Sequence, residues 1–475
     1  DQEGDSLLTS QKITGHLKLL DLRKRKLFFR RLEVENAQIH LRNDTSKNFN
    51  IKFLVEALKR KDTTKARMHT KFGDISINNS QLSFTTNRPA KKDYGIDFNK
   101  IQLDDFNIHV KNFDADSGRI NFNLSEISFQ DKSGFRLLDM DTEMFIHPEK
   151  GGFRNLVIRT PYSYINADSV VLNHGGYEHF NDFISKVKLN VAIKRSNLGF
   201  SDLAYFAKPF YGIPNQNFVF SGTVRGVVNS LRGNDVYAAM GKQTEIQTNF
   251  NTDGLPKFSE TYLYVDIDHF RTGMDDLEVL NSLLPESKSI SVPENFSNLG
   301  LIRYSGNFTG FFDDFVAYGN LKTEMGEIST DISIKPKKKQ SIKINGNLKT
   351  KNFDLGGLIN NQKNFGDLSM DVQVNGTGVR NKGFATNTDG VIKKLEINGY
   401  NYQNIELHGL LTDKKYDGAL TVEDPNVNFN FSGGIDFSED IPVFDFNAKI
   451  KEAKLNALNF VENDTTARLS FNLMS

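Results

Sequence analysis

The stretch RINFNLSEISF (Arg119–Phe129) decides the fold class that this sequence predicts. Its apolar residues Ile120, Phe122 and Leu124 alternate with asparagine and serine, so an extended chain has one apolar side and one polar side. A period of two residues predicts a half-buried β-strand. The apolar side needs a cover, which in most proteins is a second sheet or a layer of amphipathic helices.

The same period recurs from about Ile13 to the end of the chain. It is clearest in DISINNSQLSF (Asp74–Phe84), GIDFNKIQLDDFNIHV (Gly95–Val110), IQTNFNTDGLPKFSETYLYVDI (Ile246–Ile267) and VNFNFSGGIDF (Val427–Phe437). The connections are short and rich in turn residues, such as Asp253-Gly254, Asp389-Gly390 and Asn398-Gly399. We therefore expect an antiparallel meander.

The alternation changes parity at two places within these strands. One is between Leu124 and Ile127, and the other is between Phe98 and Ile101. Such slips predict β-bulges or tight bends, which increase the local twist of a sheet.

Helical spacing is rare and brief. It appears in Asn48–Arg60, Leu198–Phe210, Thr272–Pro285, Asn352–Asn360 and, more weakly, Lys454–Phe460. Most of these helices follow a strand in a recurring frame: VAIKRSNLGFSDL (Val191–Leu203), VDIDHFRTGMDDL (Val265–Leu277), GNLKTKNFDLGGL (Gly346–Leu358) and NAKIKEAKLNAL (Asn447–Leu458). A second recurring pattern is shared by FSGTVRGVVNSL (Phe220–Leu231), YSGNFTGFFDDF (Tyr304–Phe315) and VNGTGVRNKGF (Val374–Phe384). A repeat of a few strands and one short helix predicts units that touch mainly their neighbours.

A handful of short helices cannot cover the apolar side of so many strands. Three solutions remain: the sheet closes as a sandwich, it winds into a solenoid with a filled interior, or it curls into a trough that a ligand covers. Because apolar residues are presented along the whole chain, the third solution would be a hydrophobic groove.

Chain length and composition limit the class of protein. A chain of 475 residues exceeds the roughly 250 to 300 at which a single core stops growing, so several domains or a repeat are required. The composition is 38% hydrophobic, with 39 Phe and no Trp, which is too apolar for a disordered chain. There is no Cys, which removes disulfides, thiol nucleophiles and thiolate metal sites.

Charge and hydropathy exclude two further classes. Lys+Arg and Asp+Glu are both 59, so a nucleic-acid partner is not expected. Basic residues cluster in Arg23–Arg31, Lys59–Arg67 and Pro336–Gln340; headgroup attraction or a nuclear signal would explain them, but solvated strand ends are the simpler interpretation. No apolar run of about 18 residues is present. The start at DQEGDSLLTSQ lacks a signal-peptide pattern and the end falls within the strand-like ARLSFNLMS (Ala467–Ser475), so we expect an internal fragment of a longer chain.

Motifs for catalysis or metal binding find little support, and no catalytic residue and no cofactor is expected. No phosphate loop, nucleophile elbow or H-E-x-x-H occurs. HGGYEH (His174–His179) offers two histidines without a third metal ligand nearby. NFNTDGLPKFSE (Asn249–Glu260) has calcium-loop spacing, but a Pro and strand-like flanks favour an Asp-Gly hairpin. The carboxylate pairs Asp139/Asp141 and Asp266/Asp268 are predicted to lie on a solvated face, because residues i and i+2 of a strand share a side.

Two stretches resemble a known family. FRRLEVENAQIHLRNDTSKNFNIKFLVEAL (Phe29–Leu58) resembles the opening of AsmA-like proteins, where a strand pair is followed by an Asn and a short helix. GYNYQNIELHGLLTDKKYDGALTVEDPNVNFNFSGGIDFSEDIPVFDFNAKIKEAKLNALNF (Gly399–Phe460) is similar to the middle region of TamB proteins of the Bacteroidetes type. The DPN at Asp424–Asn426, the IDFS at Ile435–Ser438 and the closing KLNALNF carry the likeness.

The resemblance implies a repeating β-groove related to bridge-like lipid-transfer proteins. The expected fold is all-β with a few short helices, an elongated, twisted antiparallel sheet curled into a taco-like hydrophobic groove. The expected function is a periplasm-spanning conduit for phospholipid between the inner and outer membranes of a Gram-negative bacterium, within the translocation and assembly module. The family further implies an inner-membrane anchor through an N-terminal helix and a BamA-family, TamA-like outer-membrane barrel as partner of a C-terminal region, both outside this sequence.

The expected organisation is a series of groove repeats: residues 1–62 as AsmA-like N-terminal strands and a short helix, 63–210 as the first groove repeat or repeats, and 211–285, 286–360 and 361–475 as further repeats. The predicted groove-lining residues are the alternating apolar sets Ile75, Ile77, Leu82, Phe84, Ile120, Phe122, Leu124, Val427, Phe429 and Phe431. For each one singly, packing against neighbouring side chains is an equally good explanation.

Two other hypotheses remain open beside the conduit. An assembly factor for outer-membrane proteins would offer an open C-terminal sheet edge, near Leu469 and Phe471, for β-augmentation of client strands. A closed β-solenoid adhesin or carbohydrate binder would instead have a filled, dry interior. An enzyme is not expected.

Overall fold

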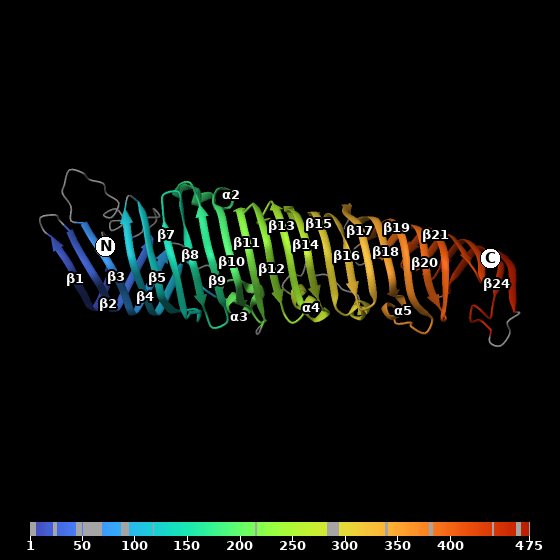
Figure 1. Cartoon of the computed structure of the whole chain (residues 1–475), viewed down its shortest axis with the longest axis horizontal. Coiled ribbons are helices and arrows are strands. Elements are labelled where there is room, and N and C mark those ends of the chain that lie inside the picture. The colour runs from blue at the N-terminus through green and yellow to red at the C-terminus, as the bar shows by residue number, and fades with distance from the viewer. Residues whose placement is uncertain are drawn as a thin grey trace. The chain divides into compact units, whose positions relative to one another are not determined.

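The computed structural model describes residues 6–21, 26–43, 50, 69–86, 95–116, 118–213, 216–282, 294–337, 341–379, 383–438, 441–461 and 467–474. These residues form strands with a few short helices, so the predicted all-β class is confirmed. The chain divides into two units, residues 1–241 and residues 242–475. Figure 1 shows the strands of each unit side by side in chain order.

Unit 1 is an open ladder in which successive strands pair along the chain, except that one two-residue strand and the strand after it both pair with the strand before them. Its strands are β1 (Leu8–Asp21), β2 (Lys26–Asn43), β3 (His69–Thr86), β4 (Lys100–Asp116), β5 (Arg119–Asp131), β6 (Arg136–Leu137), β7 (Asp139–Ile146), β8 (Lys150–Arg159), β9 (Tyr164–Asn173), β10 (Lys188–Gly199), β11 (Asn217–Val227) and β12 (Ser230–Met240). Its helical turns are η1 (Tyr177–Asp182), α2 (Phe183–Lys186), α3 (Phe200–Leu203) and η2 (Lys208–Phe210).

One pairing in unit 1 corrects the expected antiparallel meander. Strands β2 and β3 are parallel, with Leu32 opposite Ile75 and Ile39 opposite Leu82. Parallel neighbours need a crossover of a dozen or more residues, and the chain between Asn43 and His69 is long enough to supply it. The predicted helix at Asn48–Arg60 belongs to this connection and lies, except for Asn50, outside the described residues.

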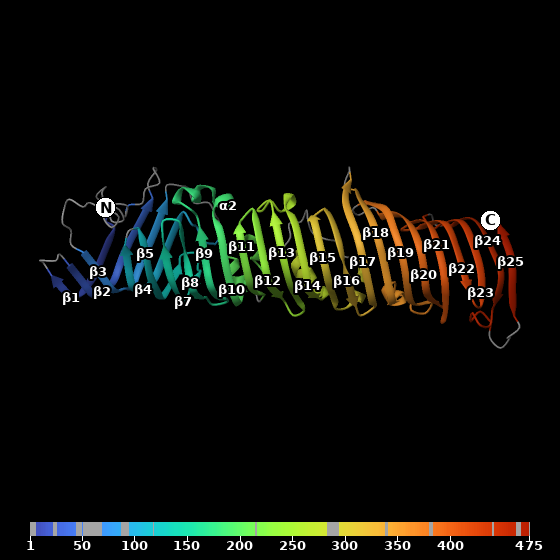
Figure 2. The ribbon, with the colours of Figure 1, turned by 45° about the horizontal axis from the view of Figure 1, so that its top comes forward.

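Unit 2 is also an open ladder, and its strands pair in antiparallel fashion along the described residues. Its strands are β13 (Thr244–Asp253), β14 (Tyr262–Thr272), β15 (Ile302–Phe311), β16 (Asp314–Thr323), β17 (Gly326–Lys337), β18 (Ser341–Asp354), β19 (Phe365–Val379), β20 (Gly383–Ile397), β21 (Tyr400–Thr412), β22 (Lys415–Asp424), β23 (Val427–Asp436), β24 (Val443–Lys454) and β25 (Arg468–Met474). Short helices η3 (Phe258–Glu260), α4 (Met274–Ser282), η5 (Glu294–Leu299) and α5 (Leu355–Leu358) lie at strand ends. The turned view of Figure 2 shows the same succession of strands.

The recurring frame found in the sequence is a strand that ends in a helical turn. Strand β10 leads into α3, β14 leads into α4 and β18 leads into α5, as predicted. The fourth copy differs, because Leu455–Asn459 form hydrogen-bonded turns rather than a helix. The three stretches that share the second recurring pattern each include a hairpin, at β11–β12, β15–β16 and β19–β20.

Two buried aspartates at the same place in this frame each bind a segment that leads into a strand, one in each unit. In unit 1 the Asp202 carboxylate accepts hydrogen bonds from the Thr160 and Ser163 hydroxyls, both at 2.5 Å. In unit 2 the Asp276 carboxylate accepts from the backbone N–H groups of Gln243 and Thr244, at 2.7 and 2.8 Å. Each carboxylate thereby satisfies polar groups that a tight turn would otherwise leave buried and unpaired.

The predicted turns and bulges are partly confirmed. Asp253-Gly254 ends β13 and Asn398-Gly399 connects β20 to β21, but Asp389-Gly390 lies inside β20 and is not a turn. A Cβ at Gly390 would lie 2.3 Å from the Asp371 carbonyl oxygen, so this glycine serves a close approach between strands. The slip before Ile127 is a bulge with Glu126 at φ 57, whereas the slip before Ile101 falls in the turn that precedes β4.

Candidate functional site

The strand register of unit 2 places apolar side chains on one face of the sheet from its first strand to its last. Directly paired residues share a face, because neighbouring strands are pleated in phase. One such row runs through Ile246, Phe270, Tyr304, Leu321, Ile328, Thr350, Met370, Ile392, Ile405, Val422, Phe429, Ile450 and Phe471. We call this side the apolar face.

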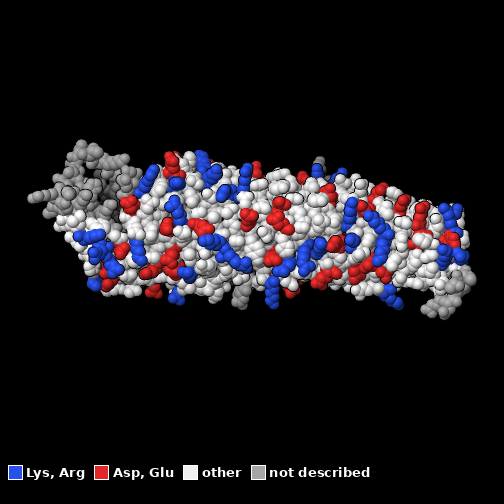
Figure 3. All heavy atoms as spheres, viewed as in Figure 1, with Lys and Arg blue, Asp and Glu red and all other residues white. Residues whose placement is uncertain are grey.

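The opposite side of the same strands is polar. Its central row runs through Asn249, Asp266, Asn307, Tyr318, Asp331, Asn347, Gln373, Asp389, His408, Ala419, Ser432 and Asn447. We call this side the polar face. Figure 3 shows one view of the surface, on which basic and acidic side chains are interspersed. The period-two alternation in the sequence therefore becomes two chemically distinct surfaces.

On strands β20 to β24, the apolar face of unit 2 is covered at one set of strand ends and exposed at the other. At the covered edge, Leu458 from the turn after β24 packs with Ile405, Val422 and Val427 in a buried cluster. An apolar hollow of about 270 Å³ lies beside it, lined by apolar and aromatic side chains such as Phe429. Toward the opposite strand ends, apolar-face side chains are exposed: Phe384, Leu411 and Phe444. These exposed side chains could contact apolar groups of another molecule.

The three predicted groove residues of β23 lie on this face and pack with neighbours of the same face. Val427 is buried, and Phe429 packs against the cluster that contains it. The Phe431 ring lies 5.3 Å from the Phe446 ring and 6.3 Å from the Tyr416 ring, measured between centroids. These side chains form part of the apolar lining and also pack with protein.

The predicted groove residues of β3 lie against apolar partners on β2. Ile75 faces Leu32, Ile77 faces Val34, Leu82 faces Ile39 and Phe84 faces Leu41. Ile77 and Leu82 pack on a buried cluster that includes Phe106. The remaining three, Ile120, Phe122 and Leu124, face Ile146, Met144 and Thr142 across the β5–β7 pair. All seven therefore share an apolar side with their neighbours in unit 1.

Short segments cover parts of the apolar side of unit 1. After α3, Tyr205 packs edge-to-face on Phe135 at 5.7 Å, and its carbonyl accepts a hydrogen bond from the Ile96 N–H. A hollow of about 440 Å³ borders this segment. Near the opposite strand ends, the buried His174 ring contacts the rings of Tyr177 and Phe180. The sequence did not predict η1 and α2, because they lack a helical apolar period.

Three threonine hydroxyls on the apolar face of unit 2 are bonded to backbone carbonyls. Thr248 donates to the Asp266 carbonyl at 2.7 Å, Thr350 to the Leu368 carbonyl at 3.0 Å and Thr388 to the Gly409 carbonyl at 3.0 Å. These threonines therefore satisfy their hydroxyls without a ligand. Thr330, which is opposite Leu348 on the same face, differs, because its buried hydroxyl has no hydrogen-bond partner.

Two tyrosines on the apolar face lie over pairs of glycines, a feature that sequence analysis missed. Gly306 is paired with Gly319 beside Tyr304, and Gly409 is paired with Gly418 beside Tyr416. The tyrosine hydroxyls donate to the Tyr318 carbonyl at 3.2 Å and the Ala419 carbonyl at 2.9 Å. Burial raises the pKa of both tyrosines. Both belong to a Tyr-x-Gly triplet, YSG or YDG, and this triplet is the sequence pattern from which the arrangement could have been predicted.

The carboxylate pairs lie on polar surfaces, as predicted. Arg159 bonds Asp139 at 2.6 Å and lies 4.0 Å from Asp141, while Asp266 accepts from the Asn307 amide at 2.8 Å. Burial, followed by the charge of Asp139, raises the pKa of Asp141 above its ordinary 3.8. Asp139, Asp141 and Asp266 are thus engaged by neighbouring strands, while Asp268 is exposed at a bulge of β14.

The candidate ligands of the metal-like motifs do not come together in the structure. Asn249 and Asn251 alternate along β13, and the Glu260 carboxylate pairs with Lys257 at 3.2 Å, so the calcium-loop spacing is a strand followed by a turn. Across the described ranges, no group of three or more His, Asp or Glu residues could hold a metal ion.

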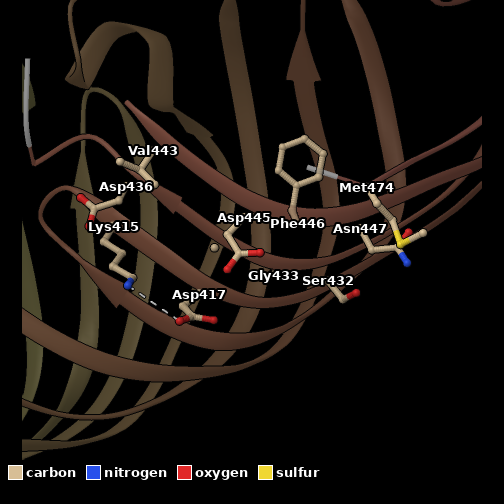
Figure 4. A pocket seen from close by; sticks show the side chains of 11 residues that line it. Lys415, Asp417, Ser432, Gly433, Asp436, Val443, Asp445, Phe446, Asn447 and Met474 are labelled. Carbon is tan, nitrogen blue, oxygen red and sulfur yellow. Dashed lines mark ion pairs between the residues drawn. The ribbon is translucent and has the colours of Figure 1, made fainter. Parts of the chain in front are cut away.

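Two polar features lie near the C-terminal strands of unit 2. A hollow of about 510 Å³, drawn in Figure 4, has Lys415 and Asp417 as an ion pair at 3.9 Å. In the DPN turn, Asp424 accepts the Tyr400 hydroxyl at 2.6 Å. Burial, followed by this hydrogen bond, raises the pKa of Tyr400 to about 12. The carboxylate thus fixes the turn that the family resemblance singled out.

Neither the search for membrane-spanning helices nor the comparison with known proteins adds information about the site. Among the helices within the described residues, none is long and apolar enough to cross a membrane. Comparisons with protein-family models, with curated proteins and with solved structures gave no match.

Proposed function

We propose that the apolar face binds the acyl chains of lipids and that the protein is a phospholipid conduit of the TamB and AsmA-like kind. The observation that carries the proposal is the row of apolar side chains contributed by consecutive strands, from Ile246 on β13 to Phe471 on β25. A stretch of that face is exposed at the strand ends near Leu411 and Phe444. Large exposed apolar surfaces of soluble chains commonly mark binding sites.

The energetics favour an acyl chain as the ligand. Transfer of one CH₂ from water to an apolar surface is worth about 0.8 kcal/mol, so two ordinary acyl chains gain on the order of 20 kcal/mol. The hydrophobic effect is non-directional, and the Thr248, Thr350 and Thr388 hydroxyls are already bonded to backbone carbonyls. A lipid tail can therefore move from strand to strand without breaking specific contacts. Transport of this kind needs no catalytic residue and no cofactor.

The cellular setting of the proposal rests on the sequence resemblance. It comprises the periplasm, phospholipid moving between the two membranes, an inner-membrane anchor and a BamA-family barrel as partner. The open ladders of both units support a groove more than a closed solenoid.

A second candidate function rests on the last strand. Among the described residues β25 pairs only with β24, and its Leu469, Phe471 and Leu473 side chains are exposed. An unpaired strand edge can accept a client strand by β-augmentation, as an assembly factor for outer-membrane proteins would require. Crosslinks from Leu469 or Phe471 to client strands rather than to lipid would favour it.

The test is mass spectrometry of lipids extracted from the protein after mild purification, compared with a soluble control of equal size. Several phospholipids per chain are expected. Lipid no higher than in the control, after a gentler preparation has excluded delipidation, would contradict the conduit.

A further inference from the structure

We propose that a basic surface of unit 1 docks the protein on an anionic lipid membrane. The surface lies on the polar side of the strands, along the edge at which α2 is drawn in Figure 1. Six exposed basic residues of β5, β8, β10, β11 and β12 make it up: Arg119, Lys150, Arg154, Lys188, Arg225 and Arg232. We call this set the basic surface.

The strand register places all six residues on one side of the sheet. Three of them are the first residues of strands that begin at this edge: Arg119, Lys150 and Lys188. Residues two apart on a strand, and residues directly paired across strands, share a side. Arg154 therefore lies on the side of Lys150, and pairings through β7 and β9 link β5, β8 and β10. Arg225 is opposite Asn190, two residues from Lys188, and Arg232 is opposite Arg225.

Positive charge is uncompensated in the rows of paired residues that contain the basic surface. Across β5 and β7 to β12, these three rows hold one acidic residue, Glu143, which is opposite Arg154 and accepts a hydrogen bond from the Asn155 amide at 3.1 Å. Within the described part of the chain, none of the six basic side chains forms an ion pair with an acidic residue. Six positive charges less one negative leave an excess of five.

Charges outside these rows reduce the excess without cancelling it. The adjoining end of β4, the turn before β8 and the segment between β9 and β10 add two basic and five acidic residues: Lys111, Lys186, Asp114, Asp116, Glu149, Glu178 and Asp182. Eight positive charges less six negative then leave two positive. Farther along β9, β10 and β12, two acidic and two basic residues balance: Asp168, Asp235, Lys194 and Arg195.

Two observations indicate a positive potential at this edge. Arg225 lies directly opposite Arg232, and like charges in that position disfavour the strand pair. Burial lowers the pKa of His147, which ends β7 at this edge, and three charges of the basic surface lower it further: Arg119, Lys150 and Arg154. An anion from outside the chain would relieve both effects.

The spread of the charges and the side chains beside them favour a membrane as the anion. Six strand-to-strand intervals from β5 to β12 extend over about 29 Å, so the charges cover a surface rather than surround one small ion. The segment between β9 and β10 presents three exposed apolar side chains at the same edge: Tyr177, Phe180 and Ile184. It is bonded to the neighbouring turns, because the Tyr177 hydroxyl donates to the His147 carbonyl and the Asn229 N–H donates to the Ile184 carbonyl.

This combination matches the interface of a bilayer. Lys and Arg meet the phosphate layer there, while Tyr and apolar side chains enter the boundary with the acyl chains. An acidic protein segment would satisfy the charges and leave the apolar side chains unexplained. The basic surface lies on the side opposite Ile120 and Phe122, so the inference does not depend on the proposed binding of acyl chains by the apolar side.

The proposal is tested by flotation of the purified chain with lipid vesicles at about 0.1 M salt, where the Debye length is about 10 Å. One set of vesicles contains phosphatidylcholine and phosphatidylglycerol, and the other contains phosphatidylcholine alone. We expect binding to the anionic vesicles to be at least about tenfold stronger, and the Arg225→Gln/Arg232→Gln variant to lose about tenfold. This variant should fold, since it removes a like-charge pair. The matched control is Lys335→Gln/Lys343→Gln, which removes a directly opposed basic pair from β17 and β18 and should bind as the unmodified chain does.

A second variant tests the apolar side chains without changing any charge. Tyr177→Ser/Ile184→Ser is expected to weaken binding to the anionic vesicles by about tenfold as well. Equal binding to both kinds of vesicle, an equal loss in the Lys335→Gln/Lys343→Gln control, or unchanged binding of either test variant would overturn the proposal. So would binding of a fluorescent glutamate-rich peptide, measured by anisotropy and lost in Arg225→Gln/Arg232→Gln, if the anionic vesicles do not bind.

Discussion

Neighbouring leucines on β21 provide a matched test of the proposed lipid-binding face. Leu411 pairs with Thr386 and Tyr416 on the apolar face, whereas Leu410 pairs with Asn387 and Asp417 on the polar face. Their exposed fractions are almost equal, 38% and 37%. Glutamate at either position places the same charge on the same strand, and only the face differs.

The expected effect follows from the exposed fraction of Leu411. Covering a whole leucine side chain is worth up to about 3 kcal/mol, so a lipid tail that covers the exposed 38% gains about 1 kcal/mol. A glutamate there loses this gain and adds the cost of desolvating a carboxylate, at least about 1 kcal/mol. Leu411→Glu should therefore weaken lipid binding at this position by about 2 kcal/mol or more, which is about thirtyfold.

The assay is a titration of the purified, delipidated chain with a fluorescent phospholipid, together with a count of lipids per chain by mass spectrometry. Circular dichroism and denaturant midpoints of both variants should agree, since the two leucines are equally exposed. Leu410→Glu should bind lipid as the unmodified chain does. If the two variants lose lipid equally, or if Leu411→Glu retains full binding, the assignment of lipid to the apolar face is refuted.

Stability measurements check the physical argument at other positions. Asp276→Ala removes the acceptor of several turn N–H groups and should lower the free energy of unfolding by about 3 kcal/mol, whereas the exposed Asp275→Ala should change it little. Burial acts to raise the pKa of Asp276, but its hydrogen bonds outweigh burial and leave the pKa below 3.8. Its contribution is therefore complete above 3.8 and is lost as pH falls through the lower folded value, which an acid titration of both variants would detect as a difference below pH 3.8. Gly418→Ala, whose Cβ would lie 2.3 Å from a carbonyl oxygen, should destabilise by about 2 kcal/mol in urea unfolding, while Gly434→Ala, with its nearest neighbour at 3.8 Å, should be neutral. Tyr416→Phe should lower the urea midpoint by an amount equivalent to about 1 kcal/mol, through loss of one hydrogen bond.

The strands could be predicted because alternation is a local property of the sequence. Ile120, Phe122 and Leu124 share a side in any extended chain, and the structure places them on one side of β5. Pairing is not local, and so the parallel contact between β2 and β3 was missed. The sequence marks Leu32 and Ile75 as strand residues, but it does not state which strand lies next to which.

The structural role of a glycine is likewise not predicted by its local sequence. Asp389-Gly390 has the sequence of a hairpin turn, yet it lies within β20, where Gly390 permits close approach to Asp371. A turn and a close approach both require the absence of a Cβ, so the dipeptide alone does not distinguish them. The exposed tyrosines Tyr264 and Tyr318 were missed for a related reason: they are ordinary strand residues until the register assigns them to the polar face.

Bulges keep the two faces distinct along a ladder of this length. A one-residue slip would move every following side chain to the other face. On β18, Leu348 and Thr350 are on the apolar face, and strict alternation would turn Phe353 toward the polar side. The bulge at Asn352, with φ 46, restores Phe353 to the apolar face, where it is opposite Leu368 and only 4% exposed. The extra residue thus carries the chain from the strand into α5 while Phe353 stays on the apolar face and covered by protein.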